Sequence, residues 1–228
     1  METATAPTGR VVLLAGATGM VGQEILAALL ADKSCQVVHS VGRRKLTLSH
    51  PKLIQHVLDF KALGQLPNAD DVYIALGTTI KVAGSQSAFR AIDFEAVVAL
   101  ALAARAQGAT RLGVVSAMGA APAARIFYSQ VKGEMEQALA AMGFKTLVIA
   151  RPAMLAGDRE ALNQPGRLGE VIGLAVTRLL KPLIPANYRS ISAQDVAHGL
   201  VQAVQLGQPG VTRLLSGALQ GAGQHAVK

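Results

Sequence analysis

Short apolar runs alternate with longer periodic stretches along almost the whole chain. The runs are rich in Val, Ile and Leu, as buried parallel strands are, and the stretches between them have the spacing of helices. The runs lie at 11–15, 36–41, 53–58, 71–76, 111–116, 145–150 and 211–216, and the helical stretches lie at 20–31, 85–107, 127–142, 166–180 and 193–205. This alternation predicts an α/β fold, a doubly wound parallel sheet with helices on both faces.

The boundaries of the predicted helices carry capping signals. Ser85 is a predicted N-cap, and Gly108 and Gly143 are predicted C-terminal stops. A chain of 228 residues suffices for one substantial domain. We therefore expect a single domain over 1–228, in which 153–189 forms a small lobe that covers the substrate and offers Asn163, Arg167 and Arg189 as polar contacts.

Composition narrows the class of protein. Hydrophobic residues make up 51% of the chain and charged residues 16%, which is the composition of a globular protein. The chain has no apolar run of the roughly 18 to 20 residues that a membrane span needs. Residues 1–9 show no export signal, and the single cysteine, Cys35, forms no internal disulfide. We expect a cytoplasmic protein without a membrane span.

The charge of the chain favours a small anionic ligand over nucleic acid. The net charge is +8, but the 22 basic residues are scattered, only 4% of residues are aromatic and Trp is absent. The five histidines lack metal-binding spacing, so we expect no metal site. The chain also lacks the phosphate-loop motif of nucleotide hydrolases and the Gly-x-Ser-x-Gly elbow of α/β-hydrolases.

A glycine-rich turn follows the first predicted strand and opens the first predicted helix. Gly16 and Gly19 permit a tight turn and close approach to a diphosphate, and Gly22 permits the helix to pack near the strand. The helix N-terminus offers free N–H groups and a partial positive charge to the anion. The predicted diphosphate contacts are Gly16, Thr18, Gly19, Met20, Val21 and Gly22.

The second strand indicates which coenzyme binds. NAD-binding folds carry an acidic residue about 20 residues after the glycines, at the end of this strand. Here Arg43 and Arg44 occupy that place, and guanidinium groups bind a 2′-phosphate well. We therefore expect NADP(H). Asp59 is a candidate for the adenine amine, and Leu76, Gly77 and Thr78 are expected beside the ribose.

Three residues form a candidate catalytic set. Tyr128 and Lys132 are four apart on a predicted helix, so they share one face. A nearby ammonium lowers the pKa of a phenol, which suits Tyr128 to proton transfer. Ser116 ends the fifth strand, where its hydroxyl is expected to polarise a substrate carbonyl.

The order and spacing of these motifs resemble the short-chain dehydrogenase/reductase superfamily. Within it, the chain is similar to the atypical branch of Tat-interacting-protein oxidoreductases. The likeness runs over nearly the whole chain, through 16–22, 76–79 with 83–84, 115–120, 128–134 and 151–159. The resemblance implies a Rossmann fold and NADPH binding, adds weight to Ser116, Tyr128 and Lys132, and places Arg151 and Pro152 near the nicotinamide.

The resulting hypothesis is an NADPH-dependent reductase of a carbonyl, or the reverse oxidation of an alcohol, acting on a small-molecule substrate. Two alternatives stay open: an NADP(H)-binding regulatory or redox-sensing module with little turnover, and a nucleotide-sugar epimerase or dehydratase, which the small lobe disfavours. The sequence does not specify the substrate, protein partners or oligomeric state.

Overall fold

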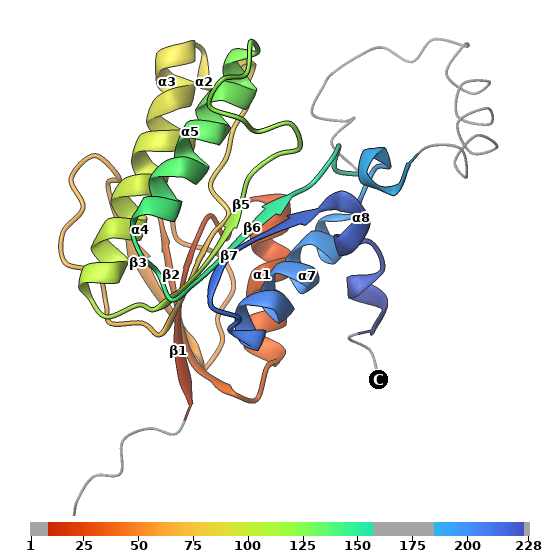
Figure 1. Ribbon diagram of the computed structural model, residues 1–228. Helices are drawn as coiled ribbons and strands as arrows, with labels where there is room; N and C mark the ends of the chain where they lie inside the picture. Colours follow the sequence, from red (N-terminus) through yellow and green to blue (C-terminus); the bar gives the residue numbers. More distant parts are fainter. Residues whose placement is uncertain (1–8, 157–184, 226–228) are drawn as a thin grey trace, which may run out of the picture.

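The computed structural model describes residues 9–156 and 185–225. Within these residues seven parallel strands form one sheet in the order β3-β2-β1-β4-β5-β6-β7 (Figure 1). The strands are β1 (Arg10–Ala15), β2 (Cys35–Gly42), β3 (Leu53–Val57), β4 (Asp71–Ile74), β5 (Arg111–Val115), β6 (Thr146–Arg151) and β7 (Gly210–Leu215). The predicted Rossmann-type α/β fold is confirmed.

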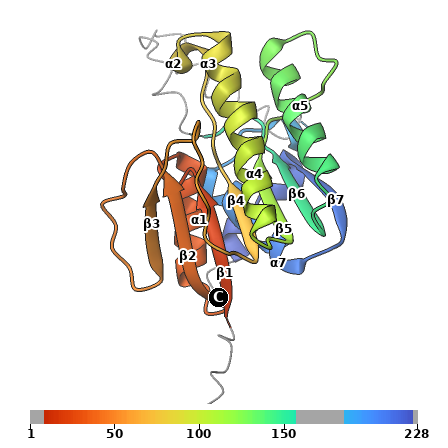
Figure 2. The same cartoon turned by 90° about the vertical axis from the view of Figure 1, so that its left-hand side faces the viewer.

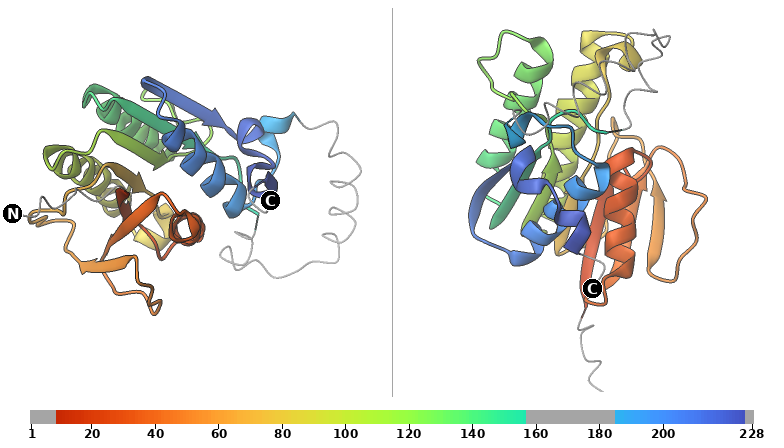
Figure 3. Two further views of the ribbon diagram at one scale, coloured as in Figure 1. Left: turned by 90° about the horizontal axis from the view of Figure 1, so that it is seen from below. Right: turned by 90° about the vertical axis from the view of Figure 1, so that its right-hand side faces the viewer.

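Helices cover both faces of the sheet (Figures 1 and 3). One face carries α1 (Met20–Ala31), α7 (Ala193–Leu206) and the short α8 (Ser216–Leu219). The other carries α3 (Gln86–Arg90), the π-helical segment η1 (Ala91–Ala96), α4 (Val97–Ala106) and α5 (Phe127–Ala141), of which α4 and α5 lie side by side in Figure 2. The remaining short helices are α2 (Ile80–Ala83), η4 (Ala186–Tyr188) and η5 (Ala222–His225).

Each face has its own hydrophobic core. Leu14 of β1 packs with Ile25 of α1 and Leu200 of α7 on one face, and all three are fully buried. Leu13 of β1 points to the other face, where it packs with the cores of α4 and α5. Successive strand residues face opposite sides, so a strand that is apolar at every position stabilises both layers. Each buried Leu contributes about 1.5 to 3 kcal/mol.

Most predicted boundaries agree with the structure to within one or two residues. Helix α1 covers the predicted 20–31, and the Ser85 side chain accepts a hydrogen bond from the N–H of Ala88 at the start of α3. Gly108 and Gly143 follow their helices with φ of +96° and +71°. The helix predicted at 166–180 lies outside the described residues. No helix in the described part of the chain is both long and apolar enough to cross a membrane.

The predicted helix at 85–107 is not a uniform α-helix. The turn at 91–96 is π-helical, and it separates α3 from α4. A π-turn inserts one residue into the helical repeat and is often found at functional sites. The apolar periodicity on either side does not reveal the insertion, which changes the direction in which Asp93 points.

The order of the strands reverses at β1, which pairs with β2 on one side and β4 on the other. The chain moves outward to β3 from one side of this point and to β7 from the other. In open α/β sheets a ligand binds at such a switch point, beyond the carboxyl ends of the strands. The glycine turn after β1 and the 75–78 segment after β4 flank this position.

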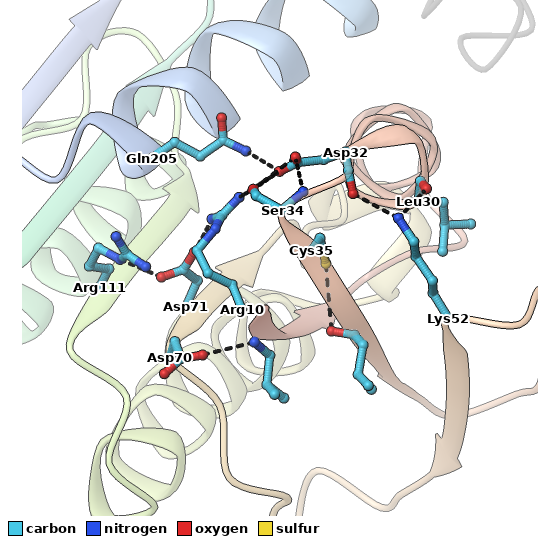
Figure 4. Close-up of polar contacts among 12 residues, drawn as sticks. Arg10, Leu30, Asp32, Ser34, Cys35, Lys52, Asp70, Asp71, Arg111 and Gln205 are labelled. Carbon is cyan, nitrogen blue, oxygen red and sulfur yellow. Dashed lines mark hydrogen bonds and ion pairs between the residues drawn. The ribbon is translucent and has the colours of Figure 1, made fainter. Parts of the chain in front are cut away.

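A charged cluster lies at the amino ends of the strands, opposite the switch point (Figure 4). Asp71 is fully buried at the start of β4 and forms ion pairs with Arg10 and Arg111, which begin β1 and β5. Arg10 also lies 2.5 Å from Asp32, which accepts a hydrogen bond from Gln205 of α7. Burial raises the pKa of the Asp71 carboxyl, and the two arginines oppose that rise. The cluster ties three strands and two helices together, far from the switch point.

Candidate functional site

Two of the three glycines in the turn between β1 and α1 are required by the fold. Gly16 has a φ of +92°, and a Cβ there would lie 2.5 Å from the Ala75 carbonyl oxygen. A Cβ on Gly22 would lie 2.0 Å from the Gly16 carbonyl oxygen. At Gly19 the nearest atom to such a Cβ is 3.5 Å away, an ordinary contact. Gly19 is therefore not required by packing.

The first turn of α1 is suited to an anion. The N-cap, Gly19, has no side chain to cap the helix, and the first turn contains no acidic residue. Thr18, Gly19 and Met20 are exposed, whereas Val21 is only 6% exposed and packs in the core. Val21 and Gly22 can thus offer a ligand only their backbone. The free N–H groups of this 12-residue helix fit a diphosphate, which is the group that the sequence predicted here.

The end of β2 presents the predicted arginine pair. Arg43 and Arg44 follow the strand in a bend, both are exposed, and neither has a hydrogen-bond or ion-pair partner among residues 9–156 and 185–225. Asp59, just beyond β3, is also exposed, and its Oδ1 accepts a hydrogen bond from the Lys61 N–H at 3.0 Å. The Leu58 N–H donates to the Gly42 carbonyl, which keeps these two strand ends together.

Lys132 is held in the interior by a carboxylate that the sequence did not single out. Its Nζ lies 2.7 Å from Oδ1 of Asp93, with the two side chains 4% and 0% exposed. Oδ2 of Asp93 accepts a hydrogen bond from the N–H of Thr78 at 3.0 Å. Burial raises the pKa of Asp93, and the Lys132 ammonium opposes that rise. Asp93 therefore joins α5 to the segment after β4.

The glycine turn and Lys132 lie beside the same segment, 75–78. Gly16 packs against the Ala75 carbonyl and the Leu76 N–H, which a Cβ would approach to 2.5 and 2.9 Å. Two residues on, a Cβ at Gly77 would lie 3.6 Å from Oδ1 of Asp93 and 3.9 Å from Nζ of Lys132. The 75–78 segment thus runs from the predicted diphosphate seat to the predicted catalytic lysine.

Tyr128 lies in the first turn of α5, one helical turn before Lys132. It is half-buried, and its ring packs against Phe89 of α3 with centroids 5.3 Å apart. Tyr128, Lys132 and Glu136 are spaced at four-residue intervals, so they lie along one face of the helix. The loop after β5 packs closely on this helix, because a Cβ at Gly133 would lie 2.1 Å from the Ala121 carbonyl carbon.

Ser116 follows β5 and contacts Glu136, a buried carboxylate that forms ion pairs with two arginines. Its Oγ lies 2.6 Å from Oε1 of Glu136. Arg151 at the end of β6 binds the same carboxylate, with Nε 2.9 Å from Oε1 and Nη2 2.5 Å from Oε2. Arg213 of β7 is 3.4 Å from Oε2. Pro152 is buried, and its carbonyl accepts a hydrogen bond from the Met118 N–H. The Arg151 guanidinium is therefore engaged by Glu136.

Sequence reasoning missed Asp93, Glu136 and Gly133. The i, i+4, i+8 spacing on α5 is a signal that points to Glu136 once Tyr128 and Lys132 are chosen. Asp93 had no comparable signal, because its direction depends on the π-helical turn. Among the residues proposed for the substrate lobe, Asn163 and Arg167 lie outside the described residues, and Arg189 is half-buried after η4.

Fold and glycine turn together define a dinucleotide-binding protein of the Rossmann fold. The model of the NAD(P)H-binding family matches residues 16–206, so the match begins at the glycine turn and includes α5. The chain belongs to this NAD(P)H-binding family.

Curated relatives support the narrower resemblance. The chain is 32% identical over 176 residues to the mitochondrial protein FMP52 of Chaetomium globosum, with 74% of each chain covered. It is 33% identical over 162 residues to the protein HTATIP2 of Rattus norvegicus, with 68% of this chain and 66% of that protein covered. The expected likeness to the Tat-interacting-protein group is confirmed.

Solved structures show the same fold at low identity. An oxidoreductase of the short-chain dehydrogenase/reductase family from Burkholderia thailandensis superposes with a TM-score of 0.67 at 18% identity, covering 96% of both chains. The protein MoeE5, solved with UDP-glucose and NAD, has a TM-score of 0.66 at 17% identity, covering 89% of this chain and 74% of MoeE5. A UDP-N-acetylglucosamine 4-epimerase is similar at 0.66 and 16%, with coverage of 92% and 77%. These likenesses show the fold and do not select a reaction.

The expected cytoplasmic location is wrong on this comparison. The FMP52 relatives from Chaetomium globosum, Coccidioides immitis and Scheffersomyces stipitis are named mitochondrial proteins. The expectation rested on the polar residues 1–9 and on the single cysteine. A lone thiol that forms no internal disulfide fits any reducing compartment. Cys35 therefore does not distinguish the cytoplasm from another reducing compartment.

Proposed function

We propose that this protein is an NADP(H)-dependent oxidoreductase that interconverts a carbonyl and an alcohol. The proposed coenzyme seat begins at the glycine turn, where the backbone N–H groups of 20–22 at the start of α1 bind the diphosphate, while the Gly19 N–H donates to the Gly16 carbonyl. It continues along Leu76, Gly77 and Thr78, where the missing side chain of Gly77 leaves room for a ribose next to Lys132. The uncapped first turn of α1 supports the first part, and the contacts around Gly77 support the second.

The preference for NADP(H) over NAD(H) rests on the end of β2. Arg43 and Arg44 are exposed cations without a partner in the described part of the chain, at the place where NAD-binding proteins carry an acidic residue. A 2′-phosphate would give these guanidinium groups the charge-assisted hydrogen bonds that they lack. Asp59 retains a free oxygen for the adenine amine, since its recorded hydrogen bond uses only Oδ1.

In the reduction direction, Tyr128 donates its phenolic proton to the substrate oxygen as that oxygen gains negative charge. Lys132 has three N–H donors. One faces Asp93, which leaves two for the phenol of Tyr128 and the ribose hydroxyls. Ser116 orients the substrate oxygen from the end of β5. NADPH, when bound, supplies the hydride that reduces the carbonyl carbon.

One observation carries this proposal. The buried Lys132 ammonium is fixed 2.7 Å from Asp93 and adjoins Gly77, on the same segment that contacts the glycine turn at Gly16. A buried ammonium needs a countercharge, which Asp93 supplies. Lys132 lies at the carboxyl ends of the strands, beside Gly77, and this is the end at which open α/β sheets bind their ligands.

The experiment is a panel of ketones and aldehydes incubated with NADPH, with coenzyme oxidation followed at 340 nm, roughly the absorption maximum of the reduced nicotinamide. Tyr128→Phe removes only the phenolic oxygen, so it should bind NADPH as tightly as the wild type. We expect its turnover to fall by about 10²- to 10⁴-fold, the usual contribution of general acid catalysis. Equal turnover by Tyr128→Phe would refute Tyr128 as the acid.

A further inference from the structure

In the described part of the chain, one side chain holds the segment that carries the arginine pair. Residues 43–49 belong to no helix or strand, and within residues 9–156 and 185–225 none of their backbone groups takes part in a backbone–backbone hydrogen bond. Their hydrogen bonds within these residues all go to the amide of Gln55 on β3. Its Oε1 accepts from the Leu46 N–H at 2.7 Å, and its Nε2 donates to the carbonyl oxygens of Leu48 at 2.9 Å and, more weakly, Leu46 at 3.4 Å.

An amide is the side-chain group that fits this place. It carries an acceptor and a donor side by side, so it can pair with the N–H and the carbonyl of one residue, Leu46. A carboxylate would instead place a second acceptor against the carbonyls of Leu46 and Leu48. The base of the Gln55 side chain is fixed by β3, whose backbone pairs with β2 in a regular parallel register as far as Gly42 (Figure 2). Gln55 therefore joins the 43–49 segment to the sheet.

Charge opposes a fixed conformation of this segment. Residues 43–45 are three consecutive cations, all exposed, and like charges this close repel one another. The connection is tied to the sheet at its two ends, where the carbonyl groups of Gly42 and Lys52 accept backbone hydrogen bonds. Between these ends, Leu46 packs in part against the core on the α1 face. The hydrogen bonds of Gln55 act at the same place, and together with this packing they limit the directions in which the cations can point.

We propose that Gln55 is a positioning residue that sets coenzyme specificity: it holds the 43–49 segment so that the arginine pair meets the 2′-phosphate of NADP(H) with little loss of conformational freedom. This inference rests on the proposed function, through its preference for NADP(H). A site that is ordered before binding loses less conformational entropy when the ligand arrives. NADH has no 2′-phosphate for the arginines, so the order that Gln55 provides should increase the affinity for NADPH and leave the affinity for NADH unchanged.

The test is a fluorescence titration of the full chain with NADPH and with NADH. Gln55→Met is the variant, because methionine is neutral and of similar length, cannot donate a hydrogen bond and accepts one only weakly. We expect the ratio of NADPH affinity to NADH affinity to fall by about three- to tenfold, the size of one net hydrogen bond, with NADH affinity unchanged. A wild type that prefers NADPH, together with a Gln55→Met protein that keeps the same ratio, would overturn the inference.

Two controls separate this effect from a general loss of stability. Gln205→Met removes an amide that donates to Asp32 at 2.8 Å, at the amino ends of the strands, and it should keep the wild-type ratio. In a chain that already carries Arg43→Ala and Arg44→Ala, adding Gln55→Met should change neither affinity further. A change of the ratio in that background, or an equal change in Gln205→Met, would overturn the inference, because the effect would then not pass through the arginine pair.

Hydrogen exchange, followed by NMR, tests the hold itself without any coenzyme. In the coenzyme-free wild type the Leu46 N–H should exchange more slowly than in Gln55→Met, by about three- to tenfold, since the variant removes its acceptor. An equal rate in the two proteins, or an unprotected Leu46 N–H in the wild type, would overturn the inference even if the variant bound no coenzyme. Equal affinities of the wild type for NADPH and NADH, with a protected Leu46 N–H, would instead refute the proposed coenzyme preference, and with it the role of Gln55 in specificity.

Discussion

The buried ion pair of Asp93 and Lys132 allows a quantitative prediction about stability. Asp93→Ala leaves a Lys132 ammonium that is 4% exposed without a countercharge, and it leaves the Thr78 N–H without its acceptor at 3.0 Å. Removing one partner of a buried pair costs about 3 to 5 kcal/mol. Asp93→Asn can keep the Thr78 hydrogen bond, so it should cost less than Asp93→Ala.

A double-mutant cycle separates the pair from the rest. Lys132→Met removes the ammonium, and Asp93→Ala with Lys132→Met removes both charges. We expect the double variant to be more stable than the sum of the two single losses predicts, by about 2 to 3 kcal/mol, because no uncompensated charge remains buried. Urea unfolding without coenzyme, followed by far-ultraviolet circular dichroism, gives the free energies if all four proteins share one m value.

The control cycle uses Arg90 and Glu134, whose side chains are 36% and 26% exposed. Their coupling should stay below about 1 kcal/mol, as for other exposed pairs. If Asp93 and Lys132 proved additive to within about 0.5 kcal/mol, the two groups would not interact as an ion pair, and the positioning of Lys132 by Asp93 would be refuted.

Three further outcomes follow from the structure. Gly22→Ala forces a Cβ to within 2.0 Å of the Gly16 carbonyl oxygen and should lower the melting temperature. At Gly19 a Cβ makes only ordinary contacts, so Gly19→Ala should melt normally, and it should bind NADPH more weakly because the methyl group lies at the proposed diphosphate seat. Burial and then the neighbouring imidazole lower the pKa of His39 below 6.5, so between that lowered value and 6.5 the unfolded chain binds more protons than the folded one. Stability should therefore fall as pH drops through this window, and His39→Gln should weaken that fall in unfolding measured against pH. Asp71→Ala should lower the free energy of unfolding in urea by about 3 kcal/mol or more. It should leave NADPH affinity unchanged, because the charged cluster lies at the amino ends of the strands, away from the proposed coenzyme site.

Much of the fold could be predicted because its signals are local. The apolar runs at 11–15 and 111–116 are buried on both faces, so their composition alone marks them as strands. Ser85 and Gly143 mark helix ends through their own side-chain and backbone chemistry. The π-helical turn was not predictable, since an inserted residue changes the direction of a side chain without changing the apolar pattern around it.

The site was predicted as a set of positions, not as a network. The glycine turn and the Tyr128–Lys132 spacing are visible in the sequence because each depends on residues near one another in the chain. Asp93 and Glu136 meet their partners across 39 and 20 residues, through tertiary packing. Arg151 forms an ion pair with Glu136, and its place near the nicotinamide stays a prediction. The coenzyme preference and the catalytic roles remain predictions.

The central claim is that the glycine turn seats a dinucleotide whose 2′-phosphate lies at Arg43, and a coenzyme titration tests it most directly. We expect intrinsic fluorescence of the bound nicotinamide to show NADPH binding at least about tenfold more tightly than NADH, a difference of about 1.4 kcal/mol. Arg43→Ala should abolish most of that preference, and Lys33→Ala, an exposed cation beyond the far end of α1, should keep it. Equal affinities for the two coenzymes in the wild type, or no binding of either, would contradict the account.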